Sequence, residues 1–223
     1  GSDLGYLTFG LILEQLGRQL TASPLFSSSL VGGTALRLAG NPAQKEALLP
    51  GIASGSVLLT LALDESSRHQ PEHTALQAVK RGEGFTLAGS KTFVAEGMCA
   101  THFVVAARTS GKPGDAQGIS LFVVPADATG ITRSALPAID SRDHARLTLT
   151  NVQVGGTALL GALDEGMPVL EKILDRARIG IAAEMLGTAC QAFDMTLDYL
   201  KTRVQFGKVI GSFQALGHRA AAM

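Results

Sequence analysis

Apolar residues recur at helical spacing along residues 168–203, and no proline interrupts this stretch after its first residue. A single helix over that range is about 50 Å long at about 1.5 Å per residue. An isolated helix is only marginally stable in water, so a helix of this length has to bury its apolar stripe against other helices. The stretch therefore predicts the first long member of a helical bundle. A turn at residues 207–211 and a further helix from residue 212 are expected to follow.

Helices are also predicted near the start of the chain. Residues 4–20 place leucine at intervals of three to five positions, which is typical of an amphipathic helix. A second helix is expected over residues 28–38. A third begins after Asn41, a favourable N-cap residue, with Pro42 at its first helical position, and it is expected to stop at Pro50.

Between these helical regions the sequence changes to short β-prone runs that are separated by Gly, Pro, Asp and Ser. Seven such runs occur, at residues 57–63, 76–80, 85–87, 103–107, 119–124, 131–134 and 146–149. No helix separates them, so they predict an antiparallel barrel or sandwich instead of a doubly wound nucleotide-binding fold. The predicted class is α+β, with N-terminal helices at 1–55, a middle β domain at 56–160 and the first helices of a C-terminal bundle at 161–223.

The charges of the chain are balanced, with 19 Lys and Arg residues against 19 Asp and Glu residues. Without a basic run, the chain is poorly suited to neutralise the phosphates of nucleic acid. No segment approaches the about 20 apolar residues of a membrane span, and residues 1–20 lack the pattern of a signal peptide. The two cysteines, Cys99 and Cys190, lie far apart in the sequence. These features predict a cytoplasmic protein with no nucleic-acid partner and no membrane span.

His69, Glu72 and His73 match the H-x-x-E-H zinc pattern. That chemistry needs both imidazoles one helical turn apart, whereas Pro71 disfavours a helix at this point. We therefore predict a solvated loop and no metal site. The sequence also lacks a G-x-S-x-G elbow, a P-loop and a G-x-G-x-x-G motif after a strand, so serine-hydrolase and Rossmann functions have no support.

Charged residues on the long helix are candidates for ligand binding. Asp175, Arg176 and Arg178 lie within an otherwise apolar stretch, where charges need a salt-bridge partner or a polar ligand. Arg203 lies at the end of the helix, close to Phe206 and a glycine. It suits an anionic ligand such as a pyrophosphate, and it equally suits an ordinary helix C-terminus. The residues alone leave both alternatives open.

Several segments resemble the acyl-CoA dehydrogenase family in order and spacing. Residues 203–220 read RVQFGKVIGSFQALGHRA and follow RIGIAAEMLG at 178–187, which together resemble the start of the family's C-terminal helical domain. GSKTFVAEG at 89–97 resembles its flavin-side strand and turn. Further matches are LEQLGR at 13–18, GISLFVV at 118–124, LTLTNVQV at 147–154 and residues 160–166. The resemblance covers nearly the whole chain.

This resemblance implies N-terminal helices, a middle β domain and a C-terminal four-helix bundle, with FAD between the β domain and the bundle. In the family, a glutamate removes the α proton of an acyl-CoA thioester while a hydride passes from the β carbon to the flavin, which yields a trans-2-enoyl-CoA. The resemblance also implies electron-transfer flavoprotein or a similar acceptor as a partner. The expected assembly is a dimer or tetramer, either a homo-oligomer or a hetero-oligomer with a related subunit.

Carried over by position, three sets of residues acquire expected roles. The residues that face this chain's own flavin are Leu61, Leu63, Asp64, Phe93 and Ala95. The residues that contact FAD bound in a neighbouring subunit are Arg203, Gln205, Phe206, Phe213 and Gln214. The residues that line the acyl-CoA channel are Asp175 and Arg178.

The chain departs from the family pattern in the cradle of the flavin and thioester. Where the family has Thr-Glu-Pro-Gly-Ala-Gly-Ser-Asp, residues 64–71 read DESSRHQP, so the glycines that permit close backbone approach are absent. Ala95 replaces a flavin-facing threonine and Glu96 replaces an asparagine. Ala177 stands where some members carry the catalytic glutamate, which other members carry further downstream. The catalytic residue is therefore unknown.

Three interpretations follow from the match and its departures. The chain is a non-catalytic subunit that completes a partner's FAD site in a hetero-oligomer, or it is a self-sufficient homo-oligomeric acyl-CoA dehydrogenase truncated at both ends. A ligand-free scaffold is the third. Flavin oxidases and monooxygenases share the fold and stay open as alternatives. The altered cradle predicts that this chain alone neither holds FAD stoichiometrically nor oxidises acyl-CoA.

Overall fold

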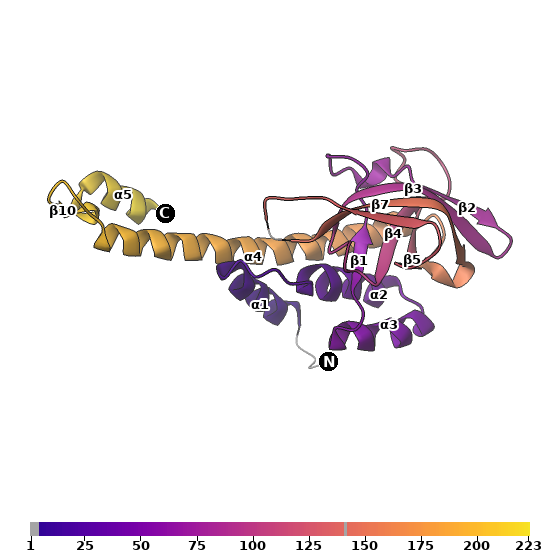
Figure 1. Cartoon of the computed structure of the whole chain (residues 1–223). Coiled ribbons are helices and arrows are strands. Elements are labelled where there is room, and N and C mark those ends of the chain that lie inside the picture. The colour runs from indigo at the N-terminus through magenta and orange to yellow at the C-terminus, as the bar shows by residue number, and fades with distance from the viewer. Residues whose placement is uncertain (1–4, 141) are drawn as a thin grey trace. The chain divides into compact units, whose positions relative to one another are not determined.

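The structure is a computed structural model that describes residues 5–140 and 142–223. Contacts within the chain define two compact units. The first comprises residues 22–179, and the second joins residues 5–21 to residues 180–223. The chain contains N-terminal helices, a central sheet and a long C-terminal helix (Figure 1). The predicted α+β fold class is confirmed.

Helical segments open the first unit. They are the π-helical segment η1 (Leu25–Gly32), α2 (Gly33–Ala39) and α3 (Pro42–Ser54). Asn41 caps α3 as expected, because its side chain accepts the Gln44 N–H at 2.8 Å and the Gln44 side chain accepts the Asn41 N–H at 3.0 Å. This reciprocal capping box fixes where α3 begins.

The expected stop of the third helix at Pro50 is wrong. Helix α3 continues through the proline to Ser54 and ends at Gly55, which adopts a left-handed φ of 81°. Leu48 and Ile52 lie on either side of Pro50, and both are buried in the core. Their burial outweighs the backbone hydrogen bond that the proline removes.

The centre of the first unit is an eight-stranded sheet in the order β6-β7-β3-β2-β4-β5-β8, with β1 paired to β4. The strands are β1 (Leu59–Ala62), β2 (Gln77–Arg81), β3 (Gly84–Ala95), β4 (His102–Arg108), β5 (Ile119–Pro125), β6 (Ile131–Ala135), β7 (His144–Gly155) and β8 (Leu159–Leu160). Each of the seven predicted runs overlaps a strand, whereas β8 was not predicted.

Most pairings in this sheet are antiparallel, but β1 and β2 both run parallel to β4. The parallel pairings were not predicted, because β-propensity does not encode which strand pairs with which. Strand β4 is buried on both faces. Phe103 and Val105 pack into one apolar core, while Val104 and Ala106 pack into a second core that includes the N-terminal helices.

The predicted long helix is confirmed as α4 (Gly166–Thr202). Its first turns belong to the first unit, where Leu170 and Ile173 are fully buried. Its later turns belong to the second unit together with α1 (Tyr6–Arg18). None of the helices in the described part of the chain combines the length and apolar character that crossing a bilayer requires.

Glycines allow α1 and α4 to approach closely within the second unit. A Cβ on Gly17 would collide with the Glu184 carbonyl oxygen, and a Cβ on Gly187 would collide with the Glu14 carbonyl oxygen. The Thr188 hydroxyl then donates to the Gly17 carbonyl at 3.0 Å. This contact leaves no room for side chains, so the glycines are required for the helix pairing.

Candidate functional site

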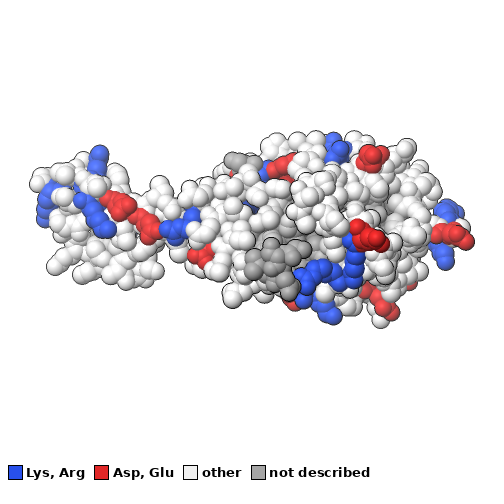
Figure 2. Space-filling model, turned by 90° about the horizontal axis from the view of Figure 1, so that it is seen from below, with Lys and Arg blue, Asp and Glu red and all other residues white. Residues whose placement is uncertain are grey.

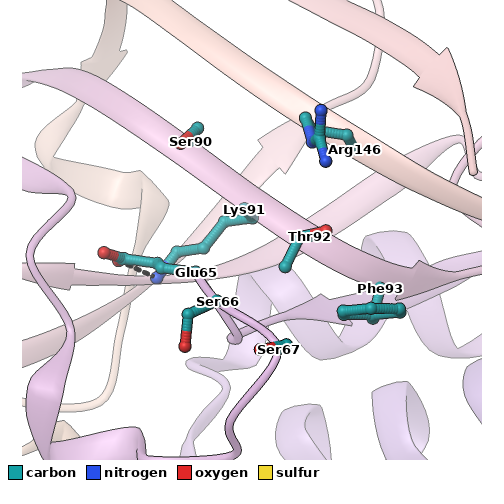
Figure 3. Close-up of a pocket in the computed structure, with 8 residues that line it drawn as sticks. All are labelled: Glu65, Ser66, Ser67, Ser90, Lys91, Thr92, Phe93 and Arg146. Atoms are coloured by element: carbon teal, nitrogen blue, oxygen red, sulfur yellow. Dashed lines mark hydrogen bonds and ion pairs between the residues drawn. The ribbon is translucent and has the colours of Figure 1, made fainter.

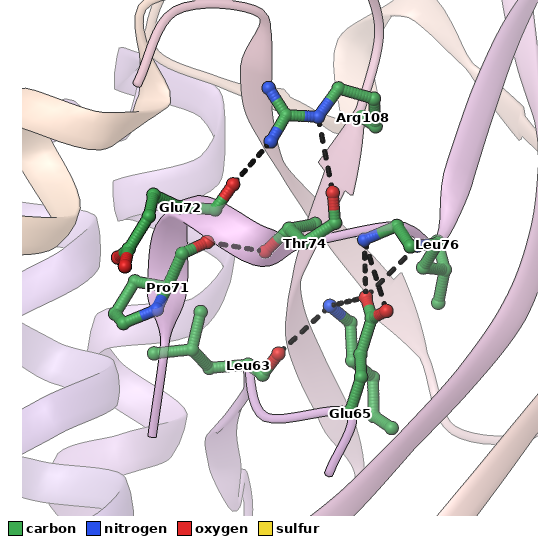
Figure 4. Close-up of polar contacts among 9 residues, drawn as sticks. Leu63, Glu65, Pro71, Glu72, Thr74, Leu76 and Arg108 are labelled. Carbon is green, nitrogen blue, oxygen red and sulfur yellow. Dashed lines mark hydrogen bonds and ion pairs between the residues drawn. The ribbon is translucent and has the colours of Figure 1, made fainter. Parts of the chain in front are cut away.

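A buried ion pair fixes the loop between β1 and β2. The Lys91 ammonium donates to the Glu65 carboxylate at 2.7 Å and to the Leu63 carbonyl at 2.9 Å. The same carboxylate accepts the N–H groups of Ala75 and Leu76, at 3.0 and 2.9 Å (Figure 4). Burial lowers the pKa of Lys91, and the Glu65 charge opposes that shift. Glu65 therefore ties both ends of the loop to strand β3.

A second buried cation, Arg108 at the end of β4, holds the far side of the same loop. Its guanidinium donates to the carbonyls of Glu72 and Thr74, at 2.7 and 3.1 Å (Figure 4). It also donates to the carbonyls of Asp115 and Gln117 in the β4–β5 loop, at 3.0 and 2.7 Å. Burial lowers the pKa of Arg108, but an arginine stays protonated in a protein. Arg108 therefore joins two loops through backbone acceptors.

Asp64 lies at the start of the loop, in the predicted cradle. Its carboxylate lies 2.9 Å from Nδ1 of His69, and its carbonyl accepts the Thr92 N–H at 2.7 Å. No glycine occurs among residues 64–71. We call residues 64–71 the cradle loop. The side-chain contact closes this loop, and without glycine its backbone lacks the conformational freedom that a close approach to a ligand requires.

Strand β3 presents Phe93 at a bulge in its pairing with β7. The residue has a φ of 51° and is 52% exposed, so its ring is available to a ligand. The Ala95 carbonyl accepts the Thr60 hydroxyl at 2.7 Å. Leu61 is half-buried and Leu63 is buried in the core. Contact of this set with a flavin stays a prediction.

Two pockets adjoin the loop at Ser66. The smaller has a volume of about 180 Å³ and is lined by Leu63, Glu65, Ser66, Arg68, Gln70, His73 and Thr74. The larger has a volume of about 300 Å³ and is lined by Glu65, Ser66, Ser67, Ser90, Lys91, Thr92, Phe93 and Arg146 (Figure 3). Both are rich in hydroxyl and cationic groups, which favours polar or anionic ligands.

The turn after β3 carries Glu96, which is 8% exposed and has a φ of 50°. Burial raises the pKa of Glu96, while a hydrogen bond to the Ser27 side chain opposes the shift. Asp143 accepts the N–H groups of Met98 and Cys99, both at 3.0 Å. Burial and Asp143 raise the pKa of the Cys99 thiol to about 11, so the thiol is protonated at neutral pH.

The two charged residues predicted to line the acyl-CoA channel meet on one face of α4. Arg178 donates to the Asp175 carboxylate at 2.8 Å, and both side chains are more than half exposed. This is the intrahelical salt bridge that the sequence allowed as an alternative. A role of the pair in substrate binding stays a prediction.

The residues expected to contact a neighbouring flavin lie together in the second unit. Strands β9 (Val204–Gln205) and β10 (Lys208–Val209) form a hairpin after α4, and α5 (Gln214–Ala222) follows the short 3₁₀ turn η4 (Ile210–Ser212). Phe206 and Gly207 both have positive φ angles, as a two-residue hairpin turn requires.

This hairpin displays cationic and aromatic groups to solvent. Phe206 is 90% exposed, and its ring centroid lies 6.2 Å from that of Phe213. The Lys208 ammonium lies 4.5 Å from the Phe213 ring centroid. The Arg203 guanidinium has no hydrogen-bond or ion-pair partner within residues 5–140 and 142–223. Its exposed charge is therefore available to an anion.

The sequence reasoning missed the Glu65–Lys91 pair and Arg108. Inward positions of β3 alternate through Phe85 and Leu87, and this period of two also places Lys91 on the buried face. A lysine at such a position signals a buried partner. The described residues contain no group of three or more His, Cys, Asp and Glu side chains arranged to hold a metal ion.

Three models of the acyl-CoA dehydrogenase family match consecutive parts of the chain. The N-terminal domain model matches residues 1–56, the middle domain model residues 64–152 and the C-terminal domain model residues 164–223. The chain belongs to the acyl-CoA dehydrogenase family, and the resemblance seen in the sequence is confirmed.

Among known relatives, the rat mitochondrial short/branched chain specific acyl-CoA dehydrogenase is 31% identical over 99% of this chain and 52% of its own length. A chain from the electron transferring flavoprotein structure of Acidaminococcus fermentans is 30% identical, with a TM-score of 0.92 over 100% of this chain and 60% of that one. A chain of the ChsE4-ChsE5 complex from Mycobacterium tuberculosis is 30% identical, with a TM-score of 0.88 over 100% of this chain and 57% of that one. The chain therefore spans little more than half the length of these relatives.

Proposed function

We propose that this chain is a subunit of an FAD-dependent acyl-CoA dehydrogenase, in which it completes the flavin site of a related partner and performs no dehydrogenation in its own site. The Asp64–His69 contact carries this proposal. It closes a loop without glycine at the position where the family cradles the flavin and the thioester. A carboxylate at this position also disfavours the phosphates of FAD.

The cradle loop and the C-terminal hairpin differ in how well their residues fit FAD. The cradle loop does not fit the group, since it lacks glycine, is closed by the Asp64–His69 contact and begins with the carboxylate of Asp64. The hairpin fits the group, because Arg203 and Lys208 supply positive charge next to the aromatic rings of Phe206 and Phe213. Gln205 and Gln214 would add amide hydrogen bonds there.

In the proposed assembly, this chain helps to bind FAD, and the partner carries out the dehydrogenation. Bound FAD supplies the acceptor for the hydride that leaves the β carbon of the acyl-CoA. Arg203 would hold the pyrophosphate through paired N–H groups. Ala177 has no group that accepts the α proton, and in the proposed assembly the glutamate that accepts it belongs to the partner. Electron-transfer flavoprotein or a similar acceptor is the electron-accepting partner proposed for this assembly.

Two of the similar structures support such an assembly. The ChsE4-ChsE5 structure is a complex of two named components, and the Acidaminococcus structure concerns an electron transferring flavoprotein. By analogy, we propose a dimer or tetramer that contains this chain and a related subunit with an intact cradle. A cytoplasmic location is part of the same proposal.

The FAD content of the purified chain tests this function. The full chain is expressed alone, and flavin absorbance after denaturation gives the ratio of FAD to protein. We expect a ratio well below one and no reduction of an artificial acceptor by acyl-CoA. A homo-oligomer with one FAD per chain that reduces the acceptor would contradict the proposal and favour the self-sufficient enzyme.

A further inference from the structure

The larger pocket beside β3 contains more hydrogen-bond donors than the protein uses. Within residues 5–140 and 142–223, the hydroxyls of Ser67, Ser90 and Thr92 have no hydrogen-bond partner. The guanidinium of Arg146 likewise has none, although it lines the same pocket from β7 (Figure 3). These unused groups come from the loop and from two strands that pair with each other.

The net charge at this pocket is positive. Lys91 and Glu65 form the buried pair at 2.7 Å, and their charges compensate each other. Among the described residues no other carboxylate lines the pocket, so the charge of Arg146 dominates it. A cation next to free hydroxyls selects an anion.

The number of donors favours a phosphate over a carboxylate. A phosphate monoester carries three terminal oxygens. These can accept hydrogen bonds from the guanidinium and from the hydroxyls at the same time. A carboxylate has only two oxygens and would leave donors unused. A planar guanidinium also binds phosphate oxygens in a paired geometry that a lysine does not reproduce.

The aromatic wall of the pocket defines the rest of the ligand. The Phe93 ring is 52% exposed and lines the pocket with the hydroxyl groups. A volume of about 300 Å³ lies at the lower end of the range for small-molecule sites. We propose that this pocket binds a phosphate monoester whose organic group is a single aromatic ring system that packs against Phe93.

Binding of such a ligand is tested on the full, flavin-free chain by calorimetric titration with inorganic phosphate and with phenyl phosphate. We expect both to bind, and phenyl phosphate to bind more tightly. Arg146→Gln should weaken both by at least about tenfold, because it removes the charge and the paired donors. Phe93→Ala should leave the affinity for inorganic phosphate unchanged and remove the preference for phenyl phosphate.

Arg81→Gln is the matched control, since Arg81 is exposed on β2 and does not line the pocket. It should bind both ligands as the unmodified chain does, and all variants should melt at similar temperatures. Absence of phosphate binding, an unchanged affinity in Arg146→Gln, or equal binding of benzoate and phenyl phosphate would each overturn the inference. The inference rests on the part of the proposed function that leaves this chain's own flavin site empty, and none of these results bears on the flavin contacts of the hairpin. Stoichiometric FAD that excludes phenyl phosphate would overturn both proposals.

Discussion

The charged side chains of the first unit, which contains the β-sheet, differ in burial and in partners from those of the C-terminal hairpin. In the sheet unit, Lys91 and Arg108 are buried, and each donates to several fixed acceptors. In the hairpin, Arg203 is exposed and its guanidinium has no partner in the described part of the chain. The contrast separates charges that hold the fold together from charges that are free to bind a ligand.

This distinction matters because both regions were associated with the flavin by family resemblance. A buried cation whose donors are already used contributes to loop geometry, and its removal should act on stability. An exposed cation beside Phe206 and Phe213 contributes little to folding, so its removal should act on binding. Arg146 in the first unit is likewise exposed and has no partner among the described residues, so its removal should also act on binding.

Lys91→Met should produce the largest effect. The substitution leaves Glu65 without its cation in a largely buried position, and losing one partner of a buried pair typically costs about 3 to 5 kcal/mol of unfolding free energy. Urea denaturation measures the change. Lys201→Met is the control, since Lys201 and Asp198 are 3.8 Å apart and both strongly exposed, and it should change stability by less than about 1 kcal/mol. Equal losses of unfolding free energy in the two variants would show that the buried pair stabilises the fold no more than the exposed one.

Arg108→Lys should have the next largest effect. One ammonium cannot reach the four carbonyls that the planar guanidinium joins, so buried acceptors lose their donors. We expect a loss of about 2 kcal/mol in the same denaturation experiment. Arg81→Lys, on an exposed position of β2, is the control. A stable Arg108→Lys variant would show that the loops do not depend on this contact.

Arg203→Ala should leave stability nearly unchanged and weaken flavin binding instead. In the assembly with a related, cradle-containing subunit, we expect about a tenfold weaker retention of FAD, because one charge-assisted contact to a phosphate is lost. FAD content after gel filtration measures this. Lys201→Ala, at the end of the same helix, provides the control. Unchanged flavin content in Arg203→Ala would show that the hairpin does not contribute to the flavin site.

The sequence predicted the elements of the fold better than their pairing. β-Propensity between turn residues placed the seven strand runs. Periodicity placed the long helix, because it follows directly from which face of the helix is buried. It did not predict that α3 continues past Pro50, because the burial of Leu48 and Ile52 is a tertiary effect. The parallel pairings of β1 and β2 with β4 were missed for the same reason.

The candidate site was predicted only in part. The resemblance brought together the hairpin residues, and the missing glycines pointed to the altered loop. The contact between Asp64 and His69 was not predicted, since residues five positions apart in an irregular loop have no fixed geometry. Arg146 was missed as well, because an arginine on an exposed strand face is ordinary until the neighbouring hydroxyls are known.

Glu96→Gln should have the smallest effect, and its sign depends on pH. Burial raises the pKa of Glu96 above its ordinary value of 4.5, so the folded chain binds this proton more tightly than the unfolded chain does. The stability that Glu96 contributes is therefore present below the ordinary pKa and is lost as the pH rises through the folded-state pKa. The variant keeps a side chain of nearly the same size and loses the titration.

The expected result is that Glu96→Gln becomes more stable relative to the unmodified chain as the pH is raised from about 4 to about 7. Thermal denaturation over this range measures the difference. Arg142 and His144 oppose the shift by favouring the carboxylate, while Asp143 reinforces it. If the two stability curves run parallel with pH, or if the variant loses stability as the pH rises, these cations outweigh burial and Glu96 is ionised in the folded chain. The turn after β3 would then be held by a charged contact, like the loop that Glu65 fixes.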